Sequence, residues 1–305
     1  MIYTITLNPA VDYFLEINGD LIIDEVNRGT NAIFKAGGKG INVSKILSLL
    51  EIDSKAVVLL GGFTGEFIRN EVSRDPHIQV IAINVDDANR INMKAHYDHK
   101  ALCINGDGPL AGEDTKKDLL ASLEAVTKED HVLISGSMMN GLDEDYLIKI
   151  ADLVHEKGAG FAIDMEKISA ETLFRCRPSL IKPNLYELQL LMNDKELDAN
   201  NAEKALSELR CQGIGSILLS LGKDGALLAD EEGFLYLEQP DTILVNKVGA
   251  GDAMLAAYLG MLIKTGDRKL ALRYGGAAGN AVASQLEDID LAKIEQFLPL
   301  MGTRE

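Results

Sequence analysis

Residues 248–263 read Val-Gly-Ala-Gly-Asp-Ala-Met-Leu-Ala-Ala-Tyr-Leu-Gly-Met-Leu-Ile, so two glycines and a carboxylate lead directly into an apolar run. The run predicts a buried helix, and the glycines let an anion approach the backbone where that helix begins. First-turn N–H groups and the helix dipole favour negative charge there. A migrating phosphoryl group would lie against Gly249, Ala250 and Gly251, with Asp252 directed at the attacking hydroxyl. Alternatively, Asp252 merely caps the helix, since Asp is a preferred N-cap residue.

Four further segments combine glycines or polar residues with an adjoining apolar run. They are Thr6-Leu7-Asn8-Pro9-Ala10-Val11-Asp12, Ala36-Gly37-Gly38-Lys39-Gly40-Ile41-Asn42-Val43, Ile181-Lys182-Pro183-Asn184-Leu185-Tyr186-Glu187 and Ser220-Leu221-Gly222-Lys223-Asp224-Gly225. In order and spacing, the five segments together resemble the phosphofructokinase B group of the ribokinase-like sugar kinases, over essentially the whole chain. The resemblance implies an ATP-dependent kinase that acts on a phosphorylated ketohexose.

Composition sets the class of protein and of partner. The chain has 305 residues, 47% of them hydrophobic, which is enough to bury a large core. Its 30 basic and 47 acidic side chains give a net charge of −17. Such a surface repels nucleic acid and acidic lipid, so neither is expected as a partner. An anionic substrate therefore requires locally clustered lysines and arginines.

Cysteine usage and the N-terminus predict a soluble, cytoplasmic protein. Cys103, Cys176 and Cys211 are widely spaced and odd in number, so they fit neither a disulfide framework nor a zinc site, and buried thiols are expected. The first residues lack the pattern of a signal peptide. The longest apolar run, 254–263, is shorter than the roughly 20 residues that a transmembrane helix needs.

Short β-branched runs alternate with amphipathic stretches along most of the chain. Strands are predicted at 2–7, 55–60, 78–83, 131–135, 160–164, 180–182 and 217–221, and helices at 40–50, 67–74, 114–126, 145–156, 202–211, 253–263, 268–283 and 291–298. This alternation predicts an α/β fold with a mainly parallel sheet covered on both faces, as one domain over residues 1–305. The family resemblance implies the ribokinase-like three-layer α/β/α sandwich.

Two segments, 11–35 and 89–104, alternate without helical periodicity and read as extended hairpins inserted into this frame. They are expected to pair into a small sheet over the mouth of the main sheet, and the resemblance implies a β lid over the sugar. The alternative is that they form edge strands of the main sheet. An exposed sheet edge or face also invites pairing, so a homodimer through the lid is an expected assembly.

The nucleotide site is predicted from the resemblance, because the P-loop motif G-x-x-x-x-G-K-[ST] is missing from the sequence. The residues that match the family's ATP-binding positions are Lys182, Asn184, Glu187, Ser220, Gly222, Gly225 and Asn280. Glu187 would act on Mg²⁺ through water, since this ion keeps much of its hydration shell. Alternatively, Asn184 and Glu187 form a capping box at a helix start, and both roles are compatible.

The sugar site is predicted in the same way. Asp12 and Asn42 match positions that bind hydroxyls, and Gly37 and Gly38 let the sugar lie against the backbone. Lys39 suits a phosphorylated sugar, because plain ribose and nucleoside kinases need no cation there. Arg28 and Arg90, one from each lid segment, would complete a clamp on the phosphate, since guanidinium groups bind phosphate bidentately. The alternative for each arginine is a solvated surface position.

The expected reaction is in-line transfer from MgATP to a hydroxyl of a sugar monophosphate, with Asp252 as the base. A helix N-terminus stabilises carboxylate and weakens the base, but positioning supplies most of the acceleration. Fructose 1-phosphate is the favoured substrate, because Arg90-Ile91-Asn92-Met93-Lys94 tilts the resemblance toward 1-phosphofructokinases, with tagatose 6-phosphate as the alternative. A sugar-phosphate-binding regulator without catalysis and a nucleoside kinase are competing functions.

Two features depart from the family pattern and leave the substrate open. Lys247 stands where a small hydroxyl residue is usual, and it either contacts phosphate or points outward. Met138, Met139 and Asn140 replace a proline-containing turn, which should loosen the loop near the sugar.

Overall fold

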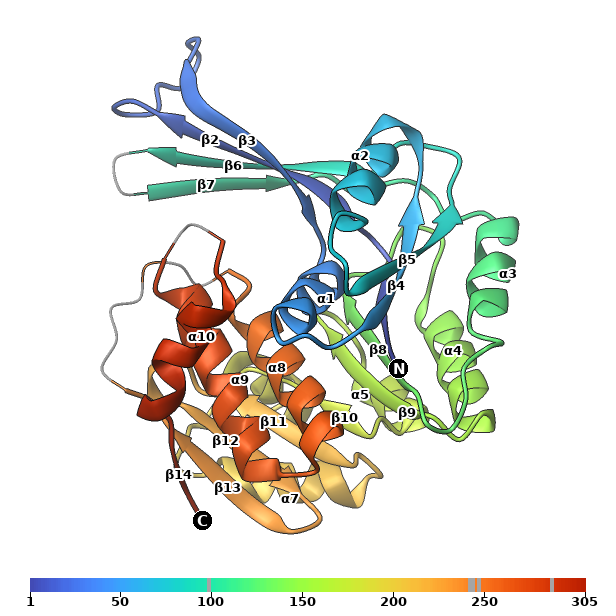
Figure 1. Cartoon of the computed structure of the whole chain (residues 1–305), viewed down its shortest axis with the longest axis vertical. Helices are drawn as coiled ribbons and strands as arrows, with labels where there is room; N and C mark the ends of the chain where they lie inside the picture. The colour runs from blue at the N-terminus through green and yellow to red at the C-terminus, as the bar shows by residue number, and fades with distance from the viewer. Residues whose placement is uncertain (98–99, 241–244, 246–247, 286–287) are drawn as a thin grey trace.

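The main sheet has ten strands, and it forms the centre of the computed structural model, which describes residues 1–97, 100–240, 245, 248–285 and 288–305 (Figure 1). Across the sheet the strands are β14 (Gly302–Arg304), β13 (Gly233–Glu238), β12 (Ala226–Asp230), β11 (Ser216–Ser220), β10 (Leu180–Ile181), β9 (Gly160–Met165), β8 (His131–Gly136), β1 (Ile2–Thr6), β4 (Ser54–Leu60) and β5 (Ile78–Asn84). The seven strands from β11 to β5 are parallel and correspond to the seven predicted strands. The antiparallel edge β12–β14 was not predicted.

Helices cover both faces of this sheet, as predicted. One face carries α1 (Lys39–Leu49), α2 (Gly62–Val72), α8 (Ala250–Thr265), α9 (Arg268–Ala283) and α10 (Leu291–Phe297). The other carries α3 (Glu113–Ser122), α4 (Glu144–Glu156), α5 (Ala170–Cys176), α6 (Leu185–Met192) and α7 (Ala202–Cys211). Helices α5 and α6 are additions to the predicted set. None of the described helices has the length and apolarity needed to cross a membrane.

Residue alternation in β1 explains why both faces are covered. Ile2 packs into the cluster that includes α8 and α9, while Tyr3 and Ile5 pack into the cluster on the opposite side. Thr4 faces α1, where its hydroxyl hydrogen-bonds that of Ser44 at 2.7 Å. Successive side chains of a strand point to opposite faces, so a strand that is apolar at nearly every position needs a layer on each side.

A second, four-stranded sheet projects from the body (Figure 1). Its order is β3 (Gly29–Gly37), β2 (Ala10–Ile17), β6 (Arg90–Tyr97) and β7 (Lys100–Asn105). These strands come from the two segments predicted to form extended hairpins. They pair with one another and not with the main sheet, so the alternative of edge strands in the main sheet is wrong.

The two faces of the second sheet differ in chemistry. The strand register aligns one polar row across the sheet, Lys35, Asp12, Asn92 and Asn105, and one apolar row on the opposite face, Phe34, Tyr13, Met93 and Ile104. The rings of Phe34 and Tyr13 stack with centroids 4.6 Å apart. Among the described residues, the apolar face is covered where it meets α2, and Phe34 and Ile104 stay half exposed.

The cysteines correct one expectation. Cys176 is buried as predicted, but Cys103 and Cys211 are exposed. Cys103 lies in β7 at the edge of the second sheet, where that sheet has no covering layer, and Cys211 is the last residue of α7.

Candidate active site

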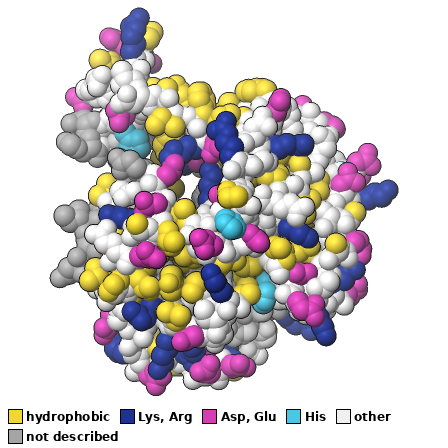
Figure 2. All heavy atoms as spheres, viewed as in Figure 1, with side chains coloured by type: hydrophobic (Ala, Val, Ile, Leu, Met, Phe, Trp, Pro, Cys, Tyr) yellow, Lys and Arg dark blue, Asp and Glu magenta, His cyan; other side chains and the backbone are white. Residues whose placement is uncertain are grey.

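Neighbouring parallel strands end along one edge of the main sheet, and the candidate site residues lie at these strand ends. Strands β11 and β8 end at Ser220 and Gly136, β10 and β1 end shortly before Lys182 and Asn8, and Asp164 is the next-to-last residue of β9. Ligands of open parallel sheets collect at this edge, because the chain turns there from strands into helices. Figure 2 shows the surface hollowed between the second sheet and the body, with Lys, Arg, Asp and Glu side chains gathered at the hollow.

Helix α8 begins at this edge in the conformation that its glycines permit. Gly249, the N-cap residue, has φ 83°, a left-handed backbone that other residues adopt only with strain. Asp252 lies in the first turn and is buried. The amide Nδ2 of Asn42, from α1, donates a hydrogen bond of 2.9 Å to Asp252 Oδ2. The structure thus joins the beginnings of two helices that are 210 residues apart in sequence.

Burial and the nearby Asp164 carboxylate raise the pKa of Asp252 to about 6, against the lowering effects of Asn42, Lys39 and Lys182. Burial disfavours the charged carboxylate, and a second negative charge adds to that cost. The sequence argument expected the helix N-terminus to make this carboxylate a weak base. Burial has the opposite effect and places the pKa close to neutral pH, where a general base is effective.

Lys182 lies beside the first turn of α8, next to Gly251. Its Nζ is 3.5 Å from Asp164 Oδ1, and both side chains are nearly inaccessible. A β-carbon on Gly251 would come within 3.1 Å of this Nζ, so any side chain there would have to displace the ammonium group by a few tenths of an ångström. The ammonium group therefore stands beside the backbone that would hold a phosphoryl group.

Lys39 is the first residue of α1, and it lies close enough to Asp252 for the two charges to interact. Gly38, which precedes it, has φ 129°, and a β-carbon on Gly136 would contact the Lys39 side chain. Lys39 Nζ is 3.6 Å from Glu166 Oε1. Burial acts to lower the pKa of Lys39, but surrounding carboxylates, Asp164 and Asp252 foremost, outweigh it and hold the pKa above its usual value. Lys39 thus stays charged and shares one electrostatic environment with Asp252.

Arg90, at the start of β6, enters the same hollow from the second sheet. Its guanidinium donates to the backbone oxygen of Asn8 at 3.0 Å and, at 3.4 Å, to Ser137 Oγ and the backbone oxygen of Gly106. Burial lowers its pKa below the usual value, against the nearby Glu166, Asp12 and Asp107. These bonds fix the guanidinium with acceptors that carry no net charge.

Arg28 is not brought to the other predicted residues. It is exposed and immediately precedes β3, whereas Gly37, at the other end of that strand, adjoins α1. Eight residues of extended strand span about 26 Å. Within one chain, the predicted triplet of cations is therefore reduced to Lys39 and Arg90.

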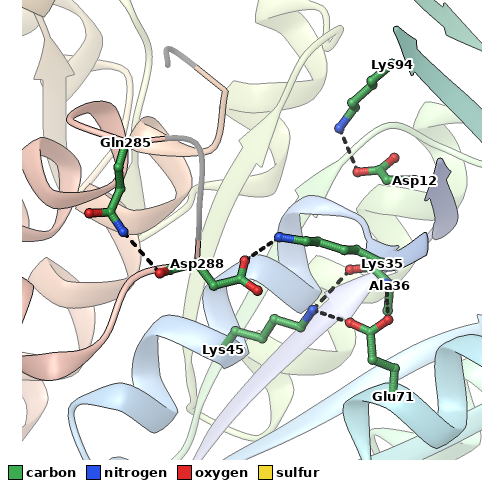
Figure 3. A network of polar contacts seen from close by, with 8 residues as sticks. All are labelled: Asp12, Lys35, Ala36, Lys45, Glu71, Lys94, Gln285 and Asp288. Carbon is green, nitrogen blue, oxygen red and sulfur yellow. Dashed lines mark hydrogen bonds and ion pairs between the residues drawn. The ribbon is translucent and has the colours of Figure 1, made fainter. Parts of the chain in front are cut away.

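Asp12 is held in the polar face of the second sheet by two donors from β6. Asn92 Nδ2 bonds its Oδ1 at 2.9 Å, and Lys94 Nζ pairs with its Oδ2 at 2.7 Å (Figure 3). A β-carbon on Gly37 would lie 2.6 Å from Asp12 Oδ2, so the glycine is required for this approach.

Three buried polar atoms around this end of the hollow have no hydrogen-bond partner within the described part of the chain, namely Asn8 Oδ1, Arg90 Nε and Asn92 Oδ1. Buried polar groups are normally satisfied, because an unpaired one costs about 1–3 kcal/mol. Asn92 bonds Asp12, Arg90 lies within reach of the Asp12 charge, and the backbone oxygen of Asn8 accepts from Arg90, so this group suits a ligand rich in hydroxyl groups.

Charged side chains from the body bind the end of β3, where the second sheet joins the body. Glu71, from α2, accepts from the backbone N–H of Ala36 at 2.6 Å and from Lys45 Nζ at 2.8 Å. Lys45, from α1, also donates to the Ala36 carbonyl at 3.2 Å. One residue earlier, Lys35 reaches Asp288, in the segment between α9 and α10, at 2.7 Å (Figure 3). The end of β3 that leads to Gly37 and Gly38 is thus held by Glu71 and Lys45 at one residue and by Asp288 at the residue before it.

The nucleotide half of the predicted site lies beside β10 and β11. Asn184 and Glu187 form a reciprocal capping box at the start of α6, as the structural alternative predicted. Ser220 pairs with Asn184 in an isolated bridge. Gly222 and Gly225 flank a short turn, both with positive φ, and a β-carbon on Gly225 would clash with the Leu237 carbonyl. A cavity of about 400 Å³ lies between the end of β9 and the start of α6, with Asp164, Glu166, Lys182 and Glu187 among its lining residues, whereas Ser220, Gly222 and Gly225 do not line it.

The remaining predicted positions have varied surroundings. Asn280 is buried in α9 and bonded to Gln239 and Gly276. The loop with Met138, Met139 and Asn140 is tied down, because Met139 is buried and Asn140 bonds residues on both sides of Leu110. Lys247 lies outside the described residues.

The carboxylates present suit Mg²⁺ in its usual protein setting. No group of three potential ligands from His, Cys, Asp and Glu is found in the described ranges. Mg²⁺ is commonly bound through one or two carboxylates, with water and substrate phosphates completing its shell. Asp164 and Glu187, which line one cavity, provide such a pair.

Sequence reasoning overlooked Asp164, Glu166, Asn8, Asn92 and Lys94. The last three lie within motifs already quoted, and each carries a polar side chain in a strand or directly after one. Asp164 is the last residue of the predicted strand 160–164 and Glu166 lies two residues beyond it, so the rule that ligands collect at strand ends could have identified both.

Comparisons with known proteins match the chain over nearly its whole length. The family model described as "pfkB family carbohydrate kinase" matches residues 5–294. A 1-phosphofructokinase of Bacillus subtilis is 33% identical over 302 residues, with 98% of each chain covered. A D-tagatose-1-phosphate kinase of Bacillus licheniformis is 34% identical over 300 residues, with 97% of each covered.

Solved structures show the same fold. The Escherichia coli phosphofructokinase-2, solved with fructose-6-phosphate, superposes with a TM-score of 0.91 at 25% identity, with 98% of both chains covered. The predicted three-layer ribokinase-like fold with a smaller separate sheet is thereby confirmed. The chain belongs to the pfkB family of carbohydrate kinases and is a phosphotransferase.

Proposed function

We propose that this protein transfers a phosphoryl group from MgATP to a ketohexose 1-phosphate, most readily fructose 1-phosphate, to give fructose 1,6-bisphosphate. The single observation that carries the proposal is the arrangement around Asp252. A buried carboxylate with a pKa of about 6 lies in the first turn of α8, where both Lys39 and Lys182 are close enough to favour its ionised form. In this proposal Lys39 serves the acceptor and Lys182 serves the donor.

In this mechanism, Asp252 accepts the proton of the attacking hydroxyl, and the N–H groups of Gly249, Ala250 and Gly251 hold the migrating phosphoryl group. Lys182 neutralises charge on the donor side, where Ser220, Gly222 and Gly225 would line the phosphates. Mg²⁺, bound through Asp164 and the water-linked Glu187, would supply further neutralisation of phosphate charge. Because the transition state of phosphoryl transfer is loose, alignment and charge neutralisation provide most of the acceleration.

Acceptor recognition follows from the other half of the hollow. Asp12 and Asn42 would bind sugar hydroxyls, and so would the unpaired oxygens of Asn8 and Asn92. Lys39 and Arg90 would hold the phosphate that the sugar already carries, because guanidinium and ammonium groups bind phosphate oxygens strongly. The hydroxyl at the opposite end of the ketohexose then points at Asp252.

Tagatose 1-phosphate is the alternative acceptor, since one of the relatives carries that activity in its name. The sequence had suggested tagatose 6-phosphate for this place, but the names of both relatives put the phosphate at C1. Fructose and tagatose differ only in configuration at C4, so the choice depends on a single hydroxyl contact.

A regulator that binds sugar phosphate without catalysis is the competing function. It gives no reason to bury a carboxylate beside another one, because burial of an unneutralised carboxylate costs stability. The position of Asp252 therefore favours an enzyme.

The test is a coupled assay of ADP release with fructose 1-phosphate, tagatose 1-phosphate, fructose 6-phosphate and tagatose 6-phosphate side by side. We expect the highest kcat/KM with fructose 1-phosphate. Preference for a 6-phosphate would mean that the C6 phosphate lies at Lys39 and Arg90 and that the C1 hydroxyl points at Asp252. Binding of the sugar phosphates with no turnover of any of the four would support the regulator.

The second sheet also supports a homodimer. The apolar row of Phe34, Tyr13, Met93 and Ile104 lies on a face with no covering layer beyond α2. An apolar sheet face of this kind invites a partner. The Escherichia coli phosphofructokinase-2 has been solved in a tetrameric form, so self-association occurs in a relative. We propose pairing of two chains through this face.

A further inference from the structure

Glu166 occupies a place for which the proposed reaction has no use. It follows β9 directly, and its N–H bonds the Gly136 carbonyl at 3.3 Å, which fixes its backbone beside the end of β8. Its carboxylate is 3.6 Å from Lys39 Nζ and is 56% exposed. A side chain with that exposure has room to rotate into solvent while its backbone stays in place.

The carboxylate pairs with Lys39 and acts electrostatically on Arg90, the two cations assigned to the acceptor's phosphate. Lys39 is its ion-pair partner, and Arg90 is tied to Ser137, the residue after the one that Glu166 bonds. Among nearby charges, Glu166 is the largest influence that favours the charged form of Arg90. Both cations thus have the same anion as a neighbour.

Charge counting indicates a conflict with the substrate. Lys39 and Arg90 supply two positive charges, Glu166 supplies one negative charge, and a phosphate monoester brings about 1.5 to 2 more. Counted over these three side chains and the ester, the charge is net negative with Glu166 in place and nearly zero without it, and Asp164 and Asp252 add further negative charge near Lys39 in either case. The ester and the carboxylate therefore compete for the same cations.

We propose that Glu166 is a displaceable counter-ion in the phosphate-binding end of the acceptor site, and so a residue that sets specificity. It pairs with Lys39 before the acceptor binds and rotates toward solvent when the phosphate ester arrives. Simple anions that offer few other contacts fail to displace it, whereas a sugar phosphate compensates through its hydroxyls. It also weakens the binding of a bisphosphate product. The inference rests on the proposed function in one respect, namely that Lys39 and Arg90 bind the acceptor's phosphate.

The first test is titration calorimetry with inorganic phosphate as the probe. Glu166→Gln removes the charge but keeps the shape, so we expect the dissociation constant for phosphate to fall about 3- to 10-fold. Glu171→Gln, an exposed first-turn residue of the nearby α5, is the matched control and should leave it unchanged. Adding Lys39→Met to Glu166→Gln should abolish the gain, which locates the phosphate at this site and not at the nucleotide phosphates.

The second test is steady-state kinetics of the same variants. For Glu166→Gln, the KM for fructose 1-phosphate should fall by a similar factor, inhibition by fructose 1,6-bisphosphate should strengthen, and the KM for ATP should stay within twofold. A raised KM for ATP or a raised Mg²⁺ requirement would overturn the proposal, because Glu166 would then serve the nucleotide cavity that it also lines.

The calorimetric test separates this inference from the proposed function. If the wild-type protein phosphorylates none of the sugar phosphates, the proposed function fails, while a tighter phosphate complex in Glu166→Gln would still support the counter-ion. If phosphate binding is unchanged by Glu166→Gln, or is undetectable in both proteins, the counter-ion is wrong, whatever the acceptor is.

Discussion

Asp252 combines burial with a neighbouring carboxylate, and both effects make its ionised form costly. The folded protein holds this proton with a pKa of about 6, against 3.8 for an unperturbed Asp. A raised pKa means that the folded state binds the proton more tightly than the unfolded chain. This residue's contribution to stability is therefore most favourable at low pH and is lost as the pH rises from about 4 through about 6.

Replacing Asp252 by Asn should separate stability from activity. We expect turnover to fall by at least about 1000-fold with little change in substrate binding. Above pH 6, the free energy of unfolding should rise by about 1–3 kcal/mol, because the buried charge is removed. Urea unfolding at pH 5 and pH 8 measures this, and the gain should shrink at pH 5. Near-normal turnover would remove Asp252 from the mechanism.

The pH profile provides an independent check on the same residue. For the wild type, kcat/KM should fall about tenfold per pH unit below pH 6, as Asp252 becomes protonated. The substrate phosphate also titrates near pH 6, so the profile alone is ambiguous. Asn42→Ala removes a hydrogen bond that lowers the pKa of Asp252, and the acid limb should therefore move to higher pH. An unmoved limb would assign the titration to the substrate.

At the scale of elements, β3 is an edge strand that ends at Gly37, so its position determines where Gly37 and Gly38 lie in the site. A free edge leaves backbone groups unpaired and the strand loosely fixed. Here Glu71 and Lys45 take both backbone groups of Ala36, so two helices of the body determine where the glycines lie (Figure 3).

Glu71→Gln should weaken the bonds that hold Ala36 and Lys45, at a residue that is not expected to contact the substrate. We expect the KM for the sugar phosphate to rise about 3- to 10-fold and the KM for ATP to stay within twofold, at a stability cost of about 1 kcal/mol. Adding Lys45→Met should have less than an additive effect, since both residues belong to one network. Glu66→Gln, an exposed position on the same helix, is the control. A lower Tm with both KM values unchanged would mean a purely structural role.

At the scale of the whole molecule, the second sheet has a polar face with Asp12 and an apolar face with no covering layer over much of its area. Burial of the apolar face between two chains would stabilise a dimer and hold both polar faces in place. The pair Lys35–Asp288 ties the same sheet to the segment after α9.

Ile104→Asp should weaken self-association, because Ile104 is half exposed on the apolar face and a carboxylate there would be buried without a partner. Sedimentation velocity at micromolar concentration should show a shift from dimer to monomer. Leu300→Asp, an equally exposed apolar position in the turn η2 (Leu298–Leu300), should leave the dimer intact. A wild-type protein that sediments as a monomer throughout would exclude pairing through this face.

Local sequence patterns determined the order of the elements and the chemical character of the site. Seven parallel strands, most of the helices and the separate sheet follow from periodicity, because that signal lies within a few neighbouring residues. A short glycine motif points to Asp252, whereas Lys39 and Lys182 were predicted from the resemblance to the family. The antiparallel edge β12–β14 and the exposed Cys103 do not follow from local patterns, since both depend on which layer covers a strand.

Only the tertiary structure decided how the charges meet. The pairs Asn42–Asp252 and Lys39–Glu166 join residues more than 100 positions apart. Arg28 and Lys39 are close in sequence, but the full length of β3 separates them in space. The pKa of Asp252 depends on burial and on Asp164, which are properties of packing. Sequence supplies the reactive groups, whereas the distances between them, and hence their electrostatic energies, exist only once the strands have taken their register.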